Sequence, residues 1–150
     1  MICGLKKEAV AFCYDALTKE EALLRVIALA HSAFRLRYPD DITASIMERE
    51  NKLSTGIGLE IAVPHCRSDF VEERISAVLV IPSGIEYNSV DGLPVKLIFL
   101  VVSPTADIQG HIACLSSIAR AVSDEETRRK LINARTPGEV FSIIGSVAEG

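Results

Sequence analysis

The chain has 150 residues, of which 49% are hydrophobic and 24% are charged, with a formal net charge of −4 and no tryptophan. This length is typical of one domain with one core, and the composition indicates an aliphatic core. Because acidic and basic residues are interspersed, the sequence has no basic stripe of the kind that binds nucleic acid or an acidic membrane surface.

The first third of the chain predicts a short strand followed by two helices. The strand covers residues 10–14. Thr18 and Glu21 have the form of a capping box, in which a hydroxyl and a carboxylate each satisfy a free N–H group of the first helical turn, so a helix is expected to begin there. A second helix is predicted over residues 41–51, because acidic residues at its start suit the helix dipole.

Two nearly continuous apolar runs in the middle of the chain are typical of central strands covered on both faces. They span residues 75–81, which Pro82-Ser83-Gly84 follows, and residues 95–102, which Ser103-Pro104 follows. A shorter strand is predicted at residues 85–87. Strands with helices before and after them predict an α/β fold, in which a mixed β-sheet is flanked by helices in a single layered domain over residues 1–150.

Three helices are predicted after these strands. The helix over residues 106–122 has an apolar stripe at helical spacing, made of Ile108, Ile112, Leu115, Ile118, Ala119 and Val122. His111 borders this stripe and is expected to lean toward the sheet. The capping-box pattern recurs at Ser123 with Glu126 and at Thr136 with Glu139, where Pro137 takes the favoured first helical position.

Residues 55–65 read T-G-I-G-L-E-I-A-V-P-H and contain the most informative pattern of the chain. Gly56 and Gly58 supply N–H groups free of Cβ bulk, as a loop that binds phosphate or another oxyanion requires. Residues 61–63 predict a strand that ends at Pro64, because proline cannot donate to a sheet ladder. His65 is therefore expected just beyond a strand end, open to solvent and a partner. On spacing alone, an ordinary surface histidine is the more frequent interpretation.

Residues 49–65 resemble the phosphorylation-site signature of the enzyme IIA proteins of the bacterial phosphotransferase system, in the fructose, mannitol and nitrogen-regulatory class. That signature is close to R-E-x-x-x-S-T-G-I-G-x-G-I-A-I-P-H, and the matching residues are Arg49, Glu50, Ser54, Thr55, Gly56, Ile57, Gly58, Ile61, Ala62, Pro64 and His65. The similarity extends to residues 18–23, 91–100 and 111–119. Glu60 departs from the pattern, which has glycine there. Its side chain either places a negative charge near the phosphate or crowds a backbone that needs positive φ.

The resemblance implies a phosphotransferase with a phosphohistidine intermediate and a mixed sheet flanked by helices. His65 would accept phosphate from a histidine-containing phosphocarrier protein. It would then pass the phosphate to a IIB domain, or its phosphorylation state would act as a signal to a regulatory protein partner. His111 is implied as the second active-site histidine; from the residues alone it is a core-edge histidine. The lack of fused transporter or IIB segments slightly favours the nitrogen-regulatory role over sugar transport.

Phosphoryl transfer to an imidazole requires a neutral ring and preorganised donors for the phosphoryl oxygens, and it requires no metal or other cofactor. Arg49 is the candidate cation, because its guanidinium offers a planar fork of donors; alternatively it is a neighbour of Glu50 on a solvated helix face. Ser54 and Thr55 hydroxyls, with the amides around Gly56 and Gly58, would supply the remaining donors. Glu50 either orients Arg49 or His65 or belongs to the helix surface.

Two alternative functions come from other classes. The first is a zinc site with nitrogen and sulfur ligands from His65, Cys66, His111 and Cys114, although adjacent residues seldom both reach one ion. The second is a non-catalytic regulatory module that keeps the fold and works by protein contact, and Glu60 is the feature that supports it.

The four cysteines, at positions 3, 13, 66 and 114, are expected to be free thiols. The N-terminus shows no secretory signal pattern, and the cytosol keeps thiols reduced. No apolar run approaches the ~20 residues that cross a bilayer. We therefore expect a cytoplasmic protein that does not insert into a membrane.

Overall fold

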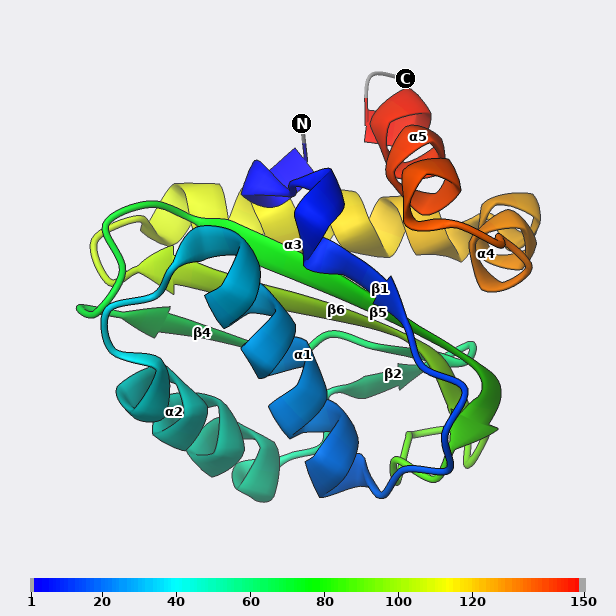
Figure 1. The fold of residues 1–150 in the computed structure, drawn as a ribbon, viewed down its shortest axis with the longest axis horizontal. Helices are drawn as coiled ribbons and strands as arrows, with labels where there is room; N and C mark the ends of the chain where they lie inside the picture. Colours follow the sequence, from blue (N-terminus) through cyan, green and yellow to red (C-terminus); the bar gives the residue numbers. More distant parts are fainter. Residues whose placement is uncertain (1, 149–150) are drawn as a thin grey trace.

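The computed structural model describes residues 2–148, which form one six-stranded sheet flanked by helices (Figure 1). In chain order the elements are η1 (Ile2–Gly4), η2 (Lys7–Ala9), β1 (Val10–Phe12), α1 (Lys19–Phe34), α2 (Pro39–Lys52), β2 (Gly56–Gly58), β3 (Ile61–Ala62), β4 (His65–Ser68), β5 (Ile75–Ile85), β6 (Val95–Pro104), α3 (Ile108–Ser123), α4 (Glu125–Ile132) and α5 (Pro137–Ala148).

The sheet is mixed, as the sequence predicts. Its strand order is β1-β5-β6-β3-β2, and β4 also pairs with β6. The central pair β5 and β6 is antiparallel, whereas β1 runs parallel to β5, and both β3 and β4 run parallel to β6. In Figure 1, α1 and α2 lie on one side of the sheet and α3, α4 and α5 lie on the other.

Helix α1 begins where its residues predict, and α2 begins slightly earlier than predicted. Thr18 and Glu21 form the predicted capping box: the Thr18 hydroxyl accepts from the Glu21 amide at 3.1 Å, and the Glu21 carboxylate accepts from the Thr18 amide at 3.0 Å. Helix α2 begins at Pro39, two residues before the predicted start, because proline has no N–H to lose in the first turn.

Strand β5 is longer than predicted. The sequence places its end at Pro82, but the strand continues to Ile85, so the separate strand predicted at residues 85–87 is wrong. Its pairing with β6 is irregular between Val80 and Ile85. A proline is tolerated at such a bulge, because the ladder hydrogen bond that it cannot donate is already absent there.

The strand predicted at residues 61–63 is β3, and Pro64 ends it as expected. The chain then starts a new strand at once: β4 begins at His65, which pairs with Val101 of β6. His65 therefore lies just beyond the end of β3, as expected, but it is itself the first residue of a strand that the sequence did not predict. Residues 61–68 follow one edge of β6 with a break at Val63-Pro64, and His65 is held by backbone pairing directly after that break.

Helix α3 buries only part of the predicted stripe. Its buried residues are His111, Cys114, Ile118 and Val122, whereas Ile108 and Ile112 are 51% and 58% exposed. Ile118 and Val122 are buried as predicted, whereas His111 and Cys114 occupy the buried face in the first half of the helix in place of Ile108 and Ile112. His111 therefore lies in the packed interior rather than at its border.

Helices α4 and α5 differ from the predicted capping boxes. The N-cap of α4 is Asp124, whose carboxylate accepts from the Thr127 amide at 3.0 Å and hydroxyl at 2.7 Å; Ser123 ends α3 instead. At α5 the Thr136 hydroxyl accepts from the Glu139 amide at 3.1 Å as predicted. The Glu139 carboxylate, however, accepts from the Arg135 amide rather than closing the box on Thr136.

The expectation of four free thiols is wrong. Cys3 of η1 and Cys114 of α3 form a disulfide with a Cα–Cα distance of 5.4 Å, while Cys13 and Cys66 are free. The two bonded residues are 111 positions apart in sequence, so only the packing of the N-terminal segment beside α3 brings them together. Spacing along the chain carries no signal for such a pair.

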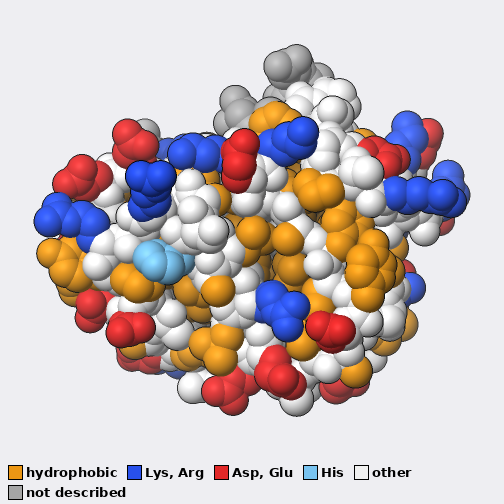
Figure 2. All heavy atoms as spheres, viewed as in Figure 1, with side chains coloured by type: hydrophobic (Ala, Val, Ile, Leu, Met, Phe, Trp, Pro, Cys, Tyr) orange, Lys and Arg blue, Asp and Glu red, His pale blue; other side chains and the backbone are white. Residues whose placement is uncertain are grey.

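The surface on the α1 and α2 side mixes both kinds of charge. Figure 2 shows basic and acidic side chains interspersed around this face, with hydrophobic side chains exposed between them. Within residues 2–148, every helix is too short or too polar to span a bilayer.

Candidate functional site

Two histidines that lie 46 residues apart in sequence meet at the α3 side of the sheet. His65 comes from the start of β4 and His111 from the first turns of α3, and their ring centroids are 5.6 Å apart with the planes tilted by 50°. His65 is half-buried, while His111 is only 7% exposed. The structure thus joins the two sequence-predicted histidines in one site, with His65 as the more accessible ring.

A backbone contact sets the tautomer of His65. Its Nδ1 atom lies 2.7 Å from the carbonyl oxygen of Val63. A carbonyl oxygen can only accept, so Nδ1 carries the hydrogen of the neutral ring and donates it to Val63. The lone pair of the neutral imidazole is therefore on Nε2.

His111 is held by a side chain that the sequence did not indicate as functional. Its Nδ1 atom lies 2.7 Å from the hydroxyl oxygen of Ser103, a fully buried residue at the end of β6. The sequence analysis treated Ser103 only as a strand terminator. Its position beneath α3 depends on the tertiary packing, so the sequence contains no local pattern that indicates its contact with His111.

The environment of His111 favours the neutral ring. Burial lowers the pKa of His111, and the nearby His65, Arg67 and Arg74 lower it further, while Asp107 acts in the opposite direction. Burial disfavours the charged form because the interior solvates charge poorly, and neighbouring positive groups repel an imidazolium. At neutral pH His111 therefore offers one ring nitrogen as donor and the other as acceptor.

A cavity of about 210 Å³ opens beside His65. It is lined by Arg49, Ser54, Thr55, Ile57, Val63, His65, Leu115 and Ala119. Three of the predicted phosphate-binding residues, Arg49, Ser54 and Thr55, thus share one cavity with His65. Its remaining lining is mostly apolar and comes from the β2–β3 segment and α3.

The predicted phosphate-binding glycines do not line this cavity. Gly56 packs against Ser89, whose hydroxyl oxygen would lie 2.3 Å from an added Cβ, and the Gly56 amide donates to the Ser54 hydroxyl at 3.2 Å. Gly58 has φ of +89° and lies close to the Asp91 carboxylate. Glycine is therefore needed at both positions because the backbone of residues 56–58 lies against the turn around residues 88–92, where a Cβ would be too close to it.

Arg49 brings the cationic group of this cavity. Its Nη1 atom donates to the Leu53 carbonyl oxygen at 3.2 Å, and among residues 2–148 it forms no ion pair with a carboxylate. Pairing of Arg49 with Glu50 is thus absent from the described part of the chain. Most donors of the guanidinium fork remain free for an anion in the cavity.

Glu50 turns inward and organises the cavity wall. It is 5% exposed, and its carboxylate accepts from the Thr55 amide at 2.8 Å and from the Thr55 hydroxyl at 2.6 Å, while Lys19 pairs with it at 2.8 Å. The Thr55 hydroxyl also lies 3.1 Å from the Tyr87 hydroxyl. The surface interpretation of Glu50 is wrong. Lys19 and Tyr87 are members of this network that the sequence analysis missed.

The network continues to the nucleophile candidate through the backbone. The Thr55 carbonyl oxygen accepts from the Val63 amide at 3.0 Å, and the Val63 carbonyl accepts from His65 Nδ1. An unbroken series of hydrogen bonds therefore leads from Glu50 through Thr55 and Val63 to His65. Burial is the main cause that raises the pKa of Tyr87, so its hydroxyl stays protonated within this series.

Glu60 occupies a strained turn away from the cavity lining. Its φ is +68°, and the preceding Leu59 and Gly58 also have positive φ, at +60° and +89°. The Glu60 carboxylate pairs with Lys96 at 3.0 Å. Of the two consequences that its departure from glycine allows, the structure shows the conformational one, because the backbone adopts the left-handed region that favours glycine.

The zinc alternative loses one of its four ligands in this structure. Cys114 is bonded to Cys3, and Cys66 follows His65 on a strand, where successive side chains point to opposite faces of the sheet. Burial raises the pKa of Cys66 to about 11, which keeps the thiol protonated. Among residues 2–148, no three His, Cys, Asp or Glu side chains are grouped to hold a metal ion.

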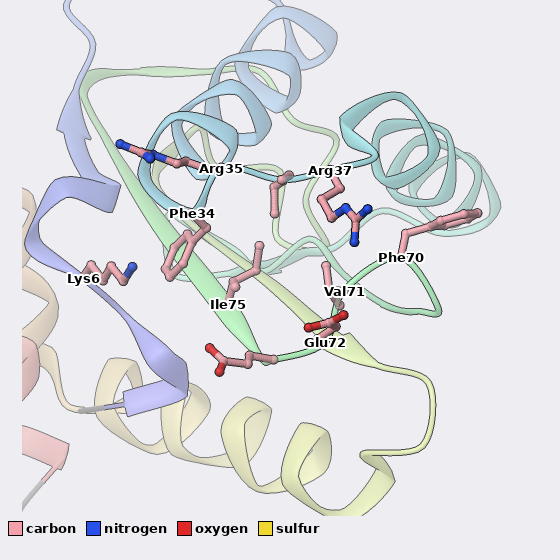
Figure 3. Close-up of a pocket in the computed structure, with 10 residues that line it drawn as sticks. Lys6, Phe34, Arg35, Arg37, Phe70, Val71, Glu72 and Ile75 are labelled. Atoms are coloured by element: carbon pink, nitrogen blue, oxygen red, sulfur yellow. The ribbon is translucent and has the colours of Figure 1, made fainter.

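A second cavity, of about 230 Å³, lies between the end of α1 and the segment before β5 (Figure 3). It is lined by Lys6, Phe34, Arg35, Leu36, Arg37, Phe70, Val71, Glu72, Glu73 and Ile75. None of these is a predicted site residue, and acidic and basic side chains share its rim. The histidine cavity is the one that combines a nucleophile candidate with a cation.

Comparison with known sequences gives one family. The pattern of the family described as "Phosphoenolpyruvate-dependent sugar phosphotransferase system, EIIA 2" matches residues 4–147. A PTS system fructose-specific EIIA component from Haloferax volcanii is 32% identical over 132 residues, which cover 88% of this chain and 86% of the relative. A nitrogen regulatory protein from Pseudomonas aeruginosa is 34% identical over 109 residues, covering 73% and 71%.

Solved structures show the same fold. The nitrogen regulatory protein IIA-Ntr from Neisseria meningitidis superposes with a TM-score of 0.85 at 25% identity, covering 93% of this chain and 95% of that one. The IIA mannitol protein from Escherichia coli superposes with a TM-score of 0.77 at 22% identity, covering 93% and 97%. The mixed sheet with helices on both sides is therefore an architecture that these proteins share.

Proposed function

Because the chain belongs to the EIIA 2 family of the phosphoenolpyruvate-dependent sugar phosphotransferase system, we propose that His65 is the residue that carries the phosphoryl group. Domains of this family are phosphotransferases that work through a phosphohistidine intermediate. The observation that supports His65 is its half-buried ring at the cavity shared with Arg49, oriented by the Val63 carbonyl.

The tautomer assigns the reacting atom. With its hydrogen on Nδ1, neutral His65 presents the Nε2 lone pair to the phosphorus of a phosphohistidine on the incoming carrier. The Nε2–P bond forms as the carrier's N–P bond breaks, and the carrier's nitrogen leaves with the electron pair. Because Nε2 has no hydrogen to lose, the step needs no general base.

Two groups supply donors to the phosphoryl oxygens in this proposal. Arg49 gives its free guanidinium N–H groups, and His111 gives an Nε2–H when Ser103 donates its hydroxyl hydrogen to Nδ1. The hydroxyls of Ser54 and Thr55 already donate, to the Tyr87 carbonyl oxygen and the Glu50 carboxylate. They act first by shaping the cavity wall, and direct contact with phosphate stays a prediction, as it does for Gly56 and Gly58.

The partners follow from the same chemistry. The donor is a histidine-containing phosphocarrier protein, and the phosphoryl group passes to a IIB domain, or its presence on His65 signals to a regulatory partner. Relatives named for both fructose and nitrogen regulation match this chain, which supports either output. A chase of the labelled protein with a purified IIB domain distinguishes them, because only the transport role moves the label rapidly.

The direct test is labelling with a ³²P-phosphorylated carrier protein. Wild-type protein should retain one acid-labile phosphate, His65→Ala should retain none, and ³¹P and ¹⁵N NMR should place the phosphate on Nε2. His31→Ala is the matched control, since His31 lies exposed on α1 away from the cavity lining and should leave labelling unchanged. A His65→Ala protein that still takes up the label would refute the assignment.

A further inference from the structure

Arg74 reaches from the residue before β5 to the first turn of α3. Its Nη2 atom is hydrogen-bonded to the Asp107 carboxylate, and the two side chains are 29% and 31% exposed. A Cβ added to Gly110 would lie 1.9 Å from the same Nη2 atom. The guanidinium therefore rests on the backbone of the helix, in space that is open only because residue 110 is glycine.

This contact is connected directly to the second histidine. Asp107 precedes α3, and its carbonyl oxygen accepts the first-turn hydrogen bond from the His111 amide at 3.1 Å. The Asp107 amide donates to the Pro104 carbonyl at 2.9 Å, while its side chain makes no capping bond to the helix. The carboxylate is thus used to tie the start of α3 to Arg74 instead of capping the helix.

Two features of this arrangement oppose stability, which favours a role beyond folding. A cation at a helix N-terminus meets the positive end of the helix dipole, an unfavourable position that Asp107 offsets. The Arg74 Nε atom is buried and has no hydrogen-bond partner among the described residues. A buried N–H without an acceptor loses its hydrogen bonds to water and gains none in the protein, which is unfavourable. Both features occur at the residue pair whose Asp107 carbonyl accepts the first-turn hydrogen bond from the His111 amide.

We propose that Arg74 is a positioning residue for phosphoryl transfer: seated on Gly110 and bonded to Asp107, it holds the first turn of α3 where His111 reaches the phosphoryl group on His65. This inference rests on the function proposed above. Arg74 acts through His111 and need not touch the phosphoryl group itself.

The sensitivity of transfer to position gives the expected magnitude. A displacement of a catalytic donor by about 1 Å can cost on the order of 10²-fold in rate. The Ser103 hydroxyl still bonds His111 from below when Arg74 is removed, so the ring is loosened rather than released. We therefore expect a loss of about 10-fold in the transfer rate.

Two substitutions remove the contact in different ways. Arg74→Met removes the charge and the donors but keeps an extended side chain. Gly110→Ala keeps both charges and pushes the Arg74 guanidinium and the Asp107 carboxylate off the helix, because an added Cβ would lie 1.9 Å from the first and 2.3 Å from the second. Alanine in a helix is otherwise favoured over glycine. Both should slow transfer from the ³²P-labelled carrier to His65 and onward, whereas Arg25→Met should not, because exposed Arg25 lies on α1, 3.8 Å from Asp15.

The pair of substitutions also tests whether they act on one contact. In an Arg74→Met background, Gly110→Ala should cause no further loss of rate, since the contact is already gone. NMR of the His111 ring reports on position and charge separately. Arg74 lowers the pKa of His111, as do Arg67 and His65 of β4, whereas Asp107 raises it. Arg74→Met should therefore raise this pKa. Gly110→Ala should shift the ring signals with a smaller change in the pKa.

The outcomes separate this inference from the proposed function. Wild-type protein that takes up no label refutes the proposed function, and this role with it. Labelled wild type together with Arg74→Met and Gly110→Ala proteins of equal rate refutes the positioning role alone. Additive losses in the double variant also refute it, because two independent defects would then be at work.

Discussion

The carboxylate of Glu50 accepts both hydrogen bonds that Thr55 donates, from its amide at 2.8 Å and from its hydroxyl at 2.6 Å. Glu50 lies at the end of α2 and Thr55 at the start of the segment that leads to His65. The bonds join the helix to that segment inside the protein, where water cannot replace them. The orientation of His65 therefore depends on a carboxylate that does not itself line the cavity beside His65.

Glu50→Gln should weaken this connection. The amide keeps one acceptor oxygen but presents an NH₂ group to a Thr55 donor, and Lys19 loses its partner. We expect the free energy of unfolding to fall by about 2–3 kcal/mol, because hydrogen bonds to buried charged groups are worth about that much. Urea unfolding measures this loss, and the rate of His65 phosphorylation should fall as well. Glu48→Gln is the control, since Glu48 is exposed; equal losses in both variants would count against the network.

His111→Ala should slow phosphoryl transfer without preventing phosphorylation of His65. The protein should fold and still take one phosphate on His65, because His65 keeps its bond to the Val63 carbonyl. Its transfer rates should fall on the order of 10²-fold, the usual effect of losing a charge-stabilising donor. Rapid-quench measurement of the ³²P label tests this. Rates equal to wild type would return His111 to a purely structural role.

Glu60→Gln should leave the lifetime of the phosphohistidine unchanged. The carboxylate is paired with Lys96 and does not line the His65 cavity, so removing its charge changes little at the phosphate. Stability should change by less than about 1 kcal/mol, as for other partly exposed ion pairs. Hydrolysis of the ³²P-labelled protein at neutral pH gives the half-life, and a half-life that lengthens in Glu60→Gln would show that the charge does act on the phosphate.

Cys3→Ser should destabilise the oxidised protein. In the loop-entropy description, a cross-link that closes a loop of about 100 residues contributes about 4–5 kcal/mol by restricting the unfolded chain. Urea unfolding without reductant should show a loss approaching this size. With excess dithiothreitol the two proteins should become similar, because the wild-type bond is then open as well. A difference that persists under reduction would show that Cys3 contributes by packing rather than by its bond.

The parts of the fold with strong local patterns were predictable. The capping box at Thr18, the helix over residues 41–51 and the two apolar strands all depend on neighbouring residues. Strand β4 was missed because its residues, H-C-R-S, show no apolar alternation and are ordered by pairing with β6. Such pairing overrides local preference.

The same distinction applies to the site. The signature and the second histidine led to His65, His111 and Arg49 from sequence, and the structure brings these residues to one place. Ser103 and the inward turn of Glu50 could not be predicted. Ser103 lies only 8 residues from His111 and Glu50 only 5 from Thr55, but tertiary packing decides which of these side chains are buried. A residue that acts through tertiary contacts leaves no pattern at a fixed spacing, whereas one that acts through a local loop does.

The bond between Cys3 and Cys114 turns most of the molecule into a covalent ring. The ring contains all six strands, α1, α2 and the first part of α3, so both partners of the histidine pair belong to it. A single protease cut in an exposed turn of the ring therefore leaves one molecule of unchanged mass apart from the added water. The same cut in the reduced protein releases two pieces, so a non-reducing gel of nicked protein reads out the state of this bond.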